Sequence, residues 1–149
     1  ITKYNIDRFI NGTTMDCSNM DITYIEYIPE TITHLYCNNN QLTELPKLPY
    51  SLRYFDCNNN KLTSLPKLKE TLIELNCHNN KLTSLPKLPD SLKYLLCDDN
   101  QLTELPKLPH FLKRLYCDNN NLPYTITIEN LKEHNKLIKR KEILKRICT

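Results

Sequence analysis

Residues 77–89 read CHNNKLTSLPKLP, and nearly the same thirteen residues begin at three other cysteines of the chain. These copies are CNNNQLTELPKLP from Cys37, CNNNKLTSLPKLK from Cys57 and CDDNQLTELPKLP from Cys97. Cys17 and Cys117 extend the same 20-residue spacing at both ends, so six of the seven cysteines mark one repeated unit. A unit this short cannot bury its own apolar side chains, and the sequence therefore predicts a solenoid in which successive units stack.

The fixed positions of one unit predict its backbone. In the third copy they are Leu72, Leu75, Cys77, Asn80, Leu82, Leu85, Pro86, Leu88 and Pro89. Leu75 and Cys77 are two positions apart, which is the period of a β-strand and turns both side chains to one face. Pro86 and Pro89 lack the N–H that a sheet ladder needs and hold φ at about −65°, so the return segment should be extended and polyproline-like. Stacked units are expected to form a parallel sheet on one side and extended segments on the other.

These residues resemble the leucine-rich repeat in its shortest, LPxLP-type class, which occurs in bacterial type III secreted effectors and in repeat proteins of large DNA viruses. The similarity covers Met15 to about Pro123. It implies a solenoid with a parallel β-sheet on the concave face, an extended convex side and a C-terminal α-helical cap. Met20 replaces the Asn of later units, and residues 121–124 abandon the pattern, so the first and last coils should be degenerate.

The chain should form one domain in three parts, and a longer gene product is compatible with its opening on Ile1. We expect an N-terminal cap over 1–12, about six coils over 13–124 and a basic helical cap over 125–149. The residues expected to cover the first coil are Tyr4, Ile6, Phe9 and Ile10. At the other end Thr127 is the expected N-cap of a helix.

The apolar residues of that C-terminal helix do not form one stripe. Leu131 and Ile138 share one side, whereas another side holds Leu137, Leu144, Ile147 and Cys148. This distribution predicts either a bend near His134 and Asn135 or a straight helix with two contacts. One contact would seal the last coil, and the second would bind another chain or stay partly exposed.

The cysteine and asparagine columns are interpreted as structural. Cysteine is a small apolar residue suited to an inward position between coils about 4.8 Å apart. A metal ladder is disfavoured because the column holds single sulfurs with no inward His beside it. The asparagines are expected to satisfy backbone groups where each strand turns away, and they are Asn40, Asn60, Asn80, Asn100 and Asn120. We predict no cofactor, no metal and no catalytic residue.

The odd cysteine count and the single Gly argue against a secreted disulfide scaffold. Reduced thiols predict an intracellular, cytoplasmic protein, in the host cytoplasm if it is viral or an effector. No apolar run reaches the roughly 18 residues of a membrane span.

Function is expected where the units differ. Three outward columns alternate with the buried positions, beginning at Thr14, Asp16 and Ser18. They combine aromatic and hydrogen-bonding side chains, as protein contacts do. The candidate protein-binding residues are Tyr36, Tyr54, Glu74, His78, Tyr94, Leu96, Arg114 and Tyr116. The centre of this face is predicted at Tyr54, Tyr94, Tyr116 and an exposed Leu96; the alternative is a merely solvated sheet.

Two charged regions offer other interpretations. Asp98, Asp99 and Asp118 should share one edge of the sheet, either as a hydrated acidic edge or as a calcium site. On the convex side one lysine repeats every 20 residues, beside Glu44 and Glu104. This row either is a solvated face or binds a repeating polyanion, and it consists of Lys47, Lys67, Lys87 and Lys107.

The sequence as a whole predicts a non-enzymatic interaction module that binds a protein or peptide on its concave face. One alternative is an anionic partner, nucleic acid or a membrane surface, bound by the basic residues of the C-terminal helix. These are Lys136, Lys139, Arg140, Lys141, Lys145 and Arg146. Another alternative is the substrate-recognition part of a longer effector enzyme. The identity of the partner and the oligomeric state stay open.

Overall fold

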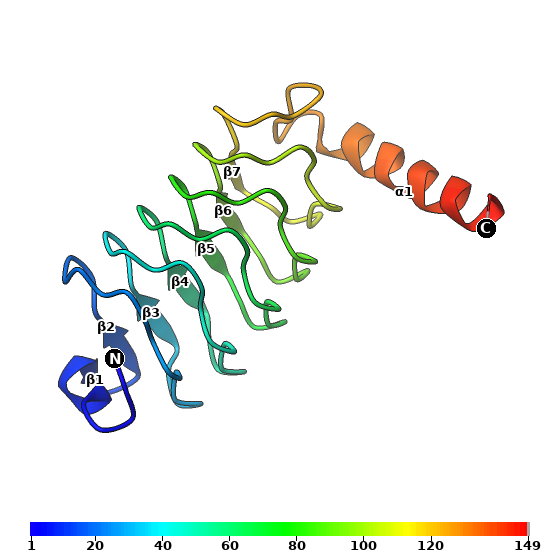
Figure 1. Ribbon diagram of the computed structural model, residues 1–149. Coiled ribbons are helices and arrows are strands. Elements are labelled where there is room, and N and C mark those ends of the chain that lie inside the picture. Colours follow the sequence, from blue (N-terminus) through cyan, green and yellow to red (C-terminus); the bar gives the residue numbers. More distant parts are fainter. Residues whose placement is uncertain (149) are drawn as a thin grey trace.

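A computed structural model describes residues 1–148 and shows a solenoid of stacked coils followed by one helix (Figure 1). Its sheet has seven strands in the order β1 to β7, and each neighbouring pair from β2 onward is parallel. The parallel strands are β2 (Thr14–Asp16), β3 (His34–Tyr36), β4 (Tyr54–Asp56), β5 (Glu74–Asn76), β6 (Tyr94–Leu96) and β7 (Arg114–Tyr116). Each residue pairs with the one 20 positions later, so the predicted parallel solenoid is confirmed.

The core is built from the columns that repeat. The middle residue of each strand and the cysteine two positions later point inward, and Leu75 and Cys77 have no exposed surface. Leu85 and Leu88 close the core from the convex side, where the chain runs without regular structure between the strands. This alternation confirms that the cysteines have the predicted inward position.

The asparagine column joins neighbouring coils, as predicted. The Nδ2 of Asn80 donates to the carbonyl oxygens of Cys57 at 3.0 Å and Cys77 at 3.2 Å. Its Oδ1 accepts from the N–H of Leu62 at 3.0 Å. The same pattern recurs at Asn40, Asn60, Asn100 and Asn120. Each carboxamide thus replaces backbone partners that the turning chain cannot supply.

A second column of Asn and Asp residues has a backbone reason that we did not predict. The second residue after each of the six core cysteines lies at positive φ: Asn19, Asn39, Asn59, Asn79, Asp99 and Asn119. Asn and Asp tolerate this left-handed conformation better than other non-glycine residues. Their repetition therefore marks the turn out of each strand and not a binding site.

The N-terminal cap is a short 3-10 helix, η1 (Ile6–Phe9), followed by a hairpin. Strand β1 (Ile10–Asn11) pairs antiparallel with β2, and Gly12 begins the two-residue loop with φ 60°, as a type II′ turn requires. Ile6 is buried and covers the first coil. Tyr4 is 86% exposed, so its predicted capping role is wrong. The chain turns it outward before η1 begins.

The C-terminal helix α1 (Leu131–Ile147) is continuous, and the bend considered near His134 is not present. The predicted N-cap is also displaced, because Asn130 precedes the helix and Thr127 caps the turn before it. Thr127 Oγ1 accepts from the N–H of Asn130 at 3.4 Å, and Asn130 Oδ1 accepts from the N–H of Thr127 at 2.9 Å. Helix and turn together form the C-terminal cap.

Polar side chains attach the first turns of α1 to the last coil. His134 Nε2 lies 3.0 Å from the carbonyl oxygen of Pro106, and its Nδ1 lies 2.8 Å from the hydroxyl of Tyr124. Asn135 accepts from the N–H of Leu108 at 2.7 Å and donates to the Leu108 carbonyl at 2.8 Å. With Leu131 buried beside them, these bonds set the angle at which the helix leaves the solenoid.

The C-terminal end of α1 extends beyond the stacked coils (Figure 1), although Lys141 still lies 3.7 Å from Glu104 of the last coil. Leu137, Leu144 and Ile147 are exposed on the helix, so the second apolar side is uncovered in this structure. Within residues 1–148, α1 falls short of the length and hydrophobicity that a bilayer-crossing helix needs.

Candidate protein-binding face

The candidate site is the sheet face, which we define as the outward side chains of strands β2 to β7 and of the residue that follows each core cysteine. The parallel register aligns these side chains in columns. Tyr54 pairs in register with Glu74, and Glu74 with Tyr94. All eight candidate residues lie on these columns. Whether they bind a partner remains a prediction.

Aromatic rings stack at the N-terminal part of the sheet face. The rings of His34 and Tyr54 lie 4.5 Å apart and 14° from parallel, and Tyr36 lies 6.4 Å from His34. The hydroxyl of Thr33 lies 2.9 Å from His34 Nδ1. This contact and the stacking hold the His34 ring in one orientation, so the aromatic group is ordered before any partner arrives.

The C-terminal part of the sheet face combines a cation with apolar surface. The Arg114 guanidinium carbon lies 6.0 Å from the centre of the Tyr94 ring. Leu96 pairs in register with Tyr116, which is 48% exposed. Leu96 itself is only partly exposed, in contrast to the exposed side chain expected from the sequence, because neighbouring strands shield it on both sides.

Between these two aromatic groups the face is polar and internally hydrogen-bonded. His78 Nδ1 lies 2.8 Å from Asn76 Oδ1, and Asn58 donates through Nδ2 to Asp56 Oδ1 at 2.6 Å. Asn58 is buried, so this member of the third outward column offers little surface. Burial raises the pKa of the Asp56 carboxyl, while the hydrogen bonds from Asn58 oppose that rise. The centre is therefore a partly desolvated strip of amide, imidazole and carboxyl groups.

The buried thiols beneath this face have no reactive character. Burial raises the pKa of Cys17 to about 12 and that of Cys117 to about 11. Burial also raises the pKa values of the core thiols between these two. A thiol that stays protonated at neutral pH is a poor nucleophile and metal ligand. All seven cysteines are free thiols, and only Cys148 is exposed.

The acidic edge does not assemble as a calcium site. Asp99 N–H donates to the carbonyl oxygen of Asp118 at 3.0 Å, and the Asp99 carboxylate accepts from Asn119 Nδ2 at 2.8 Å. Across residues 1–148 no group of three or more His, Cys, Asp or Glu is placed to hold a metal ion. This edge is better explained by bonds between neighbouring turns.

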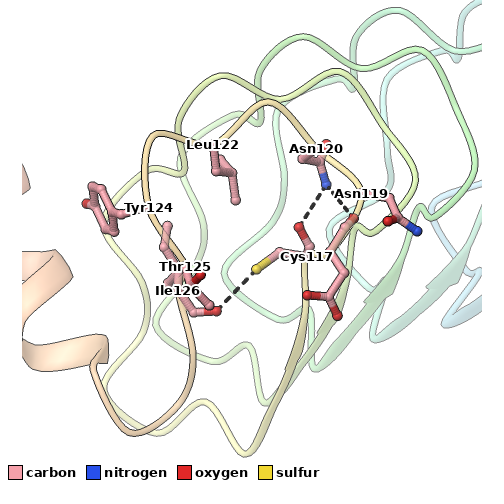
Figure 2. A pocket seen from close by; sticks show the side chains of 8 residues that line it. Cys117, Asn119, Asn120, Leu122, Tyr124, Thr125 and Ile126 are labelled. Atoms are coloured by element: carbon pink, nitrogen blue, oxygen red, sulfur yellow. Dashed lines mark hydrogen bonds between the residues drawn. The ribbon is translucent and has the colours of Figure 1, made fainter.

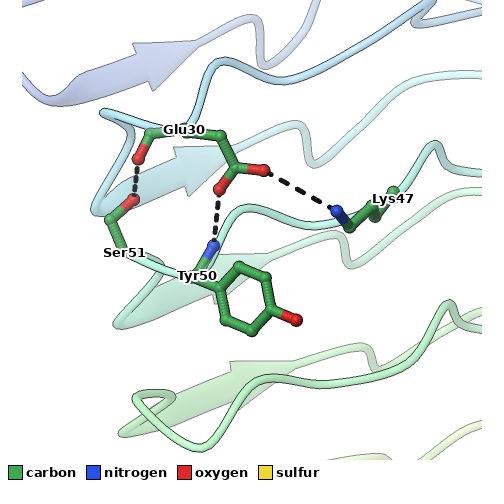
Figure 3. Close-up of polar contacts among 4 residues, drawn as sticks. All are labelled: Glu30, Lys47, Tyr50 and Ser51. Carbon is green, nitrogen blue, oxygen red and sulfur yellow. Dashed lines mark hydrogen bonds and ion pairs between the residues drawn. The ribbon is translucent and has the colours of Figure 1, made fainter.

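The convex charges form local contacts between coils. Figure 3 shows Glu30 accepting from the N–H of Tyr50 at 2.9 Å and lying 3.9 Å from Lys47, while its carbonyl accepts from Ser51 at 2.6 Å. Lys47 thus has Glu30 of the preceding coil as an ion-pair partner. The convex Lys row is exposed, as predicted.

A gap lies at the end of the repeat, where the next coil would stand. It has a volume of about 240 Å³ and is bordered by Cys117, Asn120, Leu122 and Ile126 (Figure 2). Cys117 Sγ donates to the carbonyl oxygen of Ile126 at 3.4 Å across it. The segment after Pro123 covers the last core thiol without joining the sheet, and the gap follows from this imperfect closure.

Comparison with known proteins agrees with this geometry. A family model for leucine-rich repeats in two copies matches residues 30–70. The structure of a Shigella effector leucine-rich-repeat domain superposes with a TM-score of 0.77 at 33% identity over 85% of this chain. The leucine-rich effector protein YopM from Yersinia pestis gives 0.64 at 32% identity over 79%, and YopM from Yersinia enterocolitica gives 0.59 at 27% over 77%.

The match covers only part of those proteins. The chain spans 57% of the Shigella chain, 40% of the Yersinia pestis chain and 35% of the Yersinia enterocolitica chain. No curated protein sequence matches it. The repeats are leucine-rich repeats, and the fold is a leucine-rich-repeat solenoid with a C-terminal helix.

Proposed function

We propose that this protein is a non-enzymatic interaction module that binds a protein or peptide on its sheet face. Leucine-rich-repeat domains are typically modules of this kind. The observation that carries the proposal is the contrast within each strand: the inward residue is nearly the same in every coil, whereas its outward neighbours change from Tyr to Asp to Asn to Leu. Stacking explains the first pattern and leaves the second free for recognition.

The distribution of side chains supports a protein partner over a small molecule. The aromatic groups at Tyr54 and at Tyr94–Tyr116 are separated by the polar strip around Glu74. Six coils at about 4.8 Å span about 29 Å, which is enough for one interface patch of about 800 Å². Ordered Tyr and Arg side chains are typical anchors of such interfaces.

A capture experiment with two matched variants tests this proposal. The first variant, Y54A/Y94A/Y116A, removes three rings from the sheet face. The second, Y24A/Y27A/F111A, removes three exposed rings that lie outside the strands. We expect the first variant to lose the partners that the intact chain captures from cell extract and the second to retain them. Equal capture by the intact chain and the first variant would refute the sheet face as the binding surface.

We further propose a cytoplasmic location, and a host cytoplasm if the chain comes from a virus or an effector. Seven free thiols, six of them buried, support a reducing compartment. Imaging of the tagged protein in host cells, with protease protection of the same sample, tests the location. Protection inside a secretory compartment would contradict it.

The effector-like resemblance also supports a second proposal, that the chain recognises substrates for a longer protein. The chain spans little more than half of the Shigella chain it matches, and less of the Yersinia chains. Sequencing the full open reading frame tests this directly. A reading frame that encodes only these coils and caps would remove the proposal without affecting the sheet face.

A further inference from the structure

A cleft of about 530 Å³ opens between helix α1 and the last coil, on a surface distinct from the sheet face. Lys107 and His110 of the last coil form one wall. Lys132, Lys136 and Lys139 of α1 form the other, since their i, i+4 and i+7 spacing places them on one side of the helix. The sequence separates these two groups by more than twenty residues, and the cap brings them together.

The charge of this cleft is strongly one-sided. Four lysine ammonium groups line the cleft. Among the described residues 1–148, Glu142 is the one carboxylate that lines it. Lys136 is ion-paired at 2.9 Å with Glu133, outside the lining. Lys107, Lys132 and Lys139 therefore set the positive potential. Like charges gathered on two facing walls repel one another, and an anion between them would remove that repulsion.

The shape of the cleft is set by the fold. Asn135, which lines it, bonds to both the N–H and the carbonyl of Leu108 at 2.7 and 2.8 Å. His134, one residue nearer the helix start, lies 3.0 Å from the Pro106 carbonyl oxygen. The two walls are thus held apart at a fixed distance, and a ligand would not have to order the backbone on binding.

The size and charge of the cleft favour a compact anion over a polymer. Its volume lies within the range of about 300–1,000 Å³ typical of small-molecule sites. Beyond Ile138 the groove between helix and coils has mixed charge, because Asp90 and Glu104 line it together with Lys87, Lys141 and Lys145, and Glu104 lies 3.7 Å from Lys141. A phosphate backbone that left the cleft in this direction would meet carboxylates among the lysines, whereas the cleft itself has four lysines and one carboxylate. A small ligand would contact only the cationic part.

We propose that this cleft binds a small, multiply phosphorylated anion, with Lys107, Lys132 and Lys139 as its main contacts. Lysine ammonium groups bind phosphate as point charges, and cations on opposite walls can contact separate phosphate groups of one molecule. The same chemistry is offered by a soluble polyphosphate and by a phosphorylated lipid headgroup, so the experiment must separate these sources.

Calorimetric titration with inorganic tripolyphosphate, at a salt concentration on the order of 20 mM, tests the site. The variant K107Q/K132Q/K139Q removes three cleft charges, and the control K61Q/K67Q/K81Q removes three exposed charges from the coils. The two variants have the same net charge. We expect the cleft variant to bind at least about tenfold more weakly, because a hydrogen bond to a charged group is worth about tenfold or more in affinity, and the control less than about twofold.

Two further arms identify the ligand source. Vesicles of phosphatidylcholine with phosphatidylinositol 4,5-bisphosphate, compared with soluble inositol trisphosphate, distinguish a lipid headgroup from a free anion; cleft-dependent binding of either supports the site. A single-stranded oligonucleotide serves as the polymer competitor. The proposal would be overturned if both variants weakened tripolyphosphate binding equally, or if tripolyphosphate did not bind at low salt. It would also be overturned if the oligonucleotide bound more tightly than tripolyphosphate and the control variant weakened oligonucleotide binding as much as the cleft variant did. Thermal unfolding of both variants verifies that the exposed substitutions leave the fold intact.

Discussion

The inward and outward side chains of the same strands follow opposite rules. The inward residue of β3, β5, β6 and β7 is Leu, with Phe55 in β4 and Met15 in β2. One position later the outward residues are Asp16, Tyr36, Asp56, Asn76, Leu96 and Tyr116. Inward side chains must fit between coils about 4.8 Å apart, whereas outward ones face solvent. Repetition therefore reports packing, and variation marks the surface on which recognition is free to act.

The strongest test of the inward side is alkaline pH. Below about pH 7.5 the core thiols are protonated in both the folded and the unfolded chain, because the ordinary pKa of a cysteine thiol is about 8.5. Above it the unfolded thiols ionise, while burial keeps the folded ones protonated, so the free energy of unfolding falls as pH rises. Each buried thiol contributes about 1.4 kcal/mol per pH unit, and the six act together. Urea unfolding between pH 8 and pH 11 should show a steep loss of stability.

A cysteine variant identifies the thiols as the cause of that loss. C77A should reduce the pH slope by one proton, since Cys77 is buried and its pKa is raised by that burial. C148A should leave the slope unchanged, because Cys148 is exposed. An unchanged slope in C77A would assign the alkaline loss to other groups.

Removal of one inward carboxamide should have the next largest effect. Asn80→Ala leaves the Leu62 N–H and the carbonyls of Cys57 and Cys77 without this partner, for an expected loss of about 3 kcal/mol in the free energy of unfolding. Asn38→Ala is the matched control on the outward side and should change it by less than about 0.5 kcal/mol. Urea denaturation measures the free energy of unfolding of both variants. Similar losses in the two would contradict the different roles of inward and outward side chains.

A smaller effect is expected where one inward residue is exchanged for its repeat consensus. Phe55 occupies the position of Leu35 and Leu75, and it is fully packed. Phe55→Leu should lower the free energy of unfolding by about 1 kcal/mol, because the smaller side chain leaves unfilled volume between adapted neighbours. Thermal unfolding detects this change. A gain in stability would show that the consensus residue fits this coil better than Phe does.

The smallest effect should come from the same exchange on the outward side. Leu96→Asn copies the residue found at Asn76 in the preceding coil. Because Leu96 is only partly shielded, the free energy of unfolding should change by less than about 0.5 kcal/mol, as for most surface substitutions. A loss comparable to that of Phe55→Leu would mean that the outward columns also support the solenoid.

Periodicity was sufficient to predict most of the coil interior. The strand direction, the inward cysteines and the bonding role of residues such as Asn80 all follow from one 20-residue pattern, because every coil provides the environment of the next. The same logic placed the eight candidate residues on one face. It did not anticipate that Asn58 would be buried or Leu96 half-shielded, since these depend on the size of side chains one coil away.

The ends were predicted less well because no repeat constrains them. Tyr4 appeared apolar enough to cap the first coil, but Ile6 has that role. Gly12 was a usable signal for the β1–β2 hairpin, because a type II′ turn needs Gly at the first of its two central positions, and Gly12 has the positive φ of that position. Thr127 was recognised as a capping residue, yet its bonds close a turn before α1.

The 20-residue pattern is enough to specify the solenoid, its parallel register and its buried columns, because stacking of nearly identical units imposes the same local environment at every twentieth residue. How the ends close and which distant charges meet depend instead on tertiary contacts. Helix α1 is attached through His134 and Asn135, whose bonds to the last coil leave no periodic trace. That attachment places Lys132 and Lys139 opposite Lys107, a relation that depends on the angle of the helix and not on any spacing along the chain.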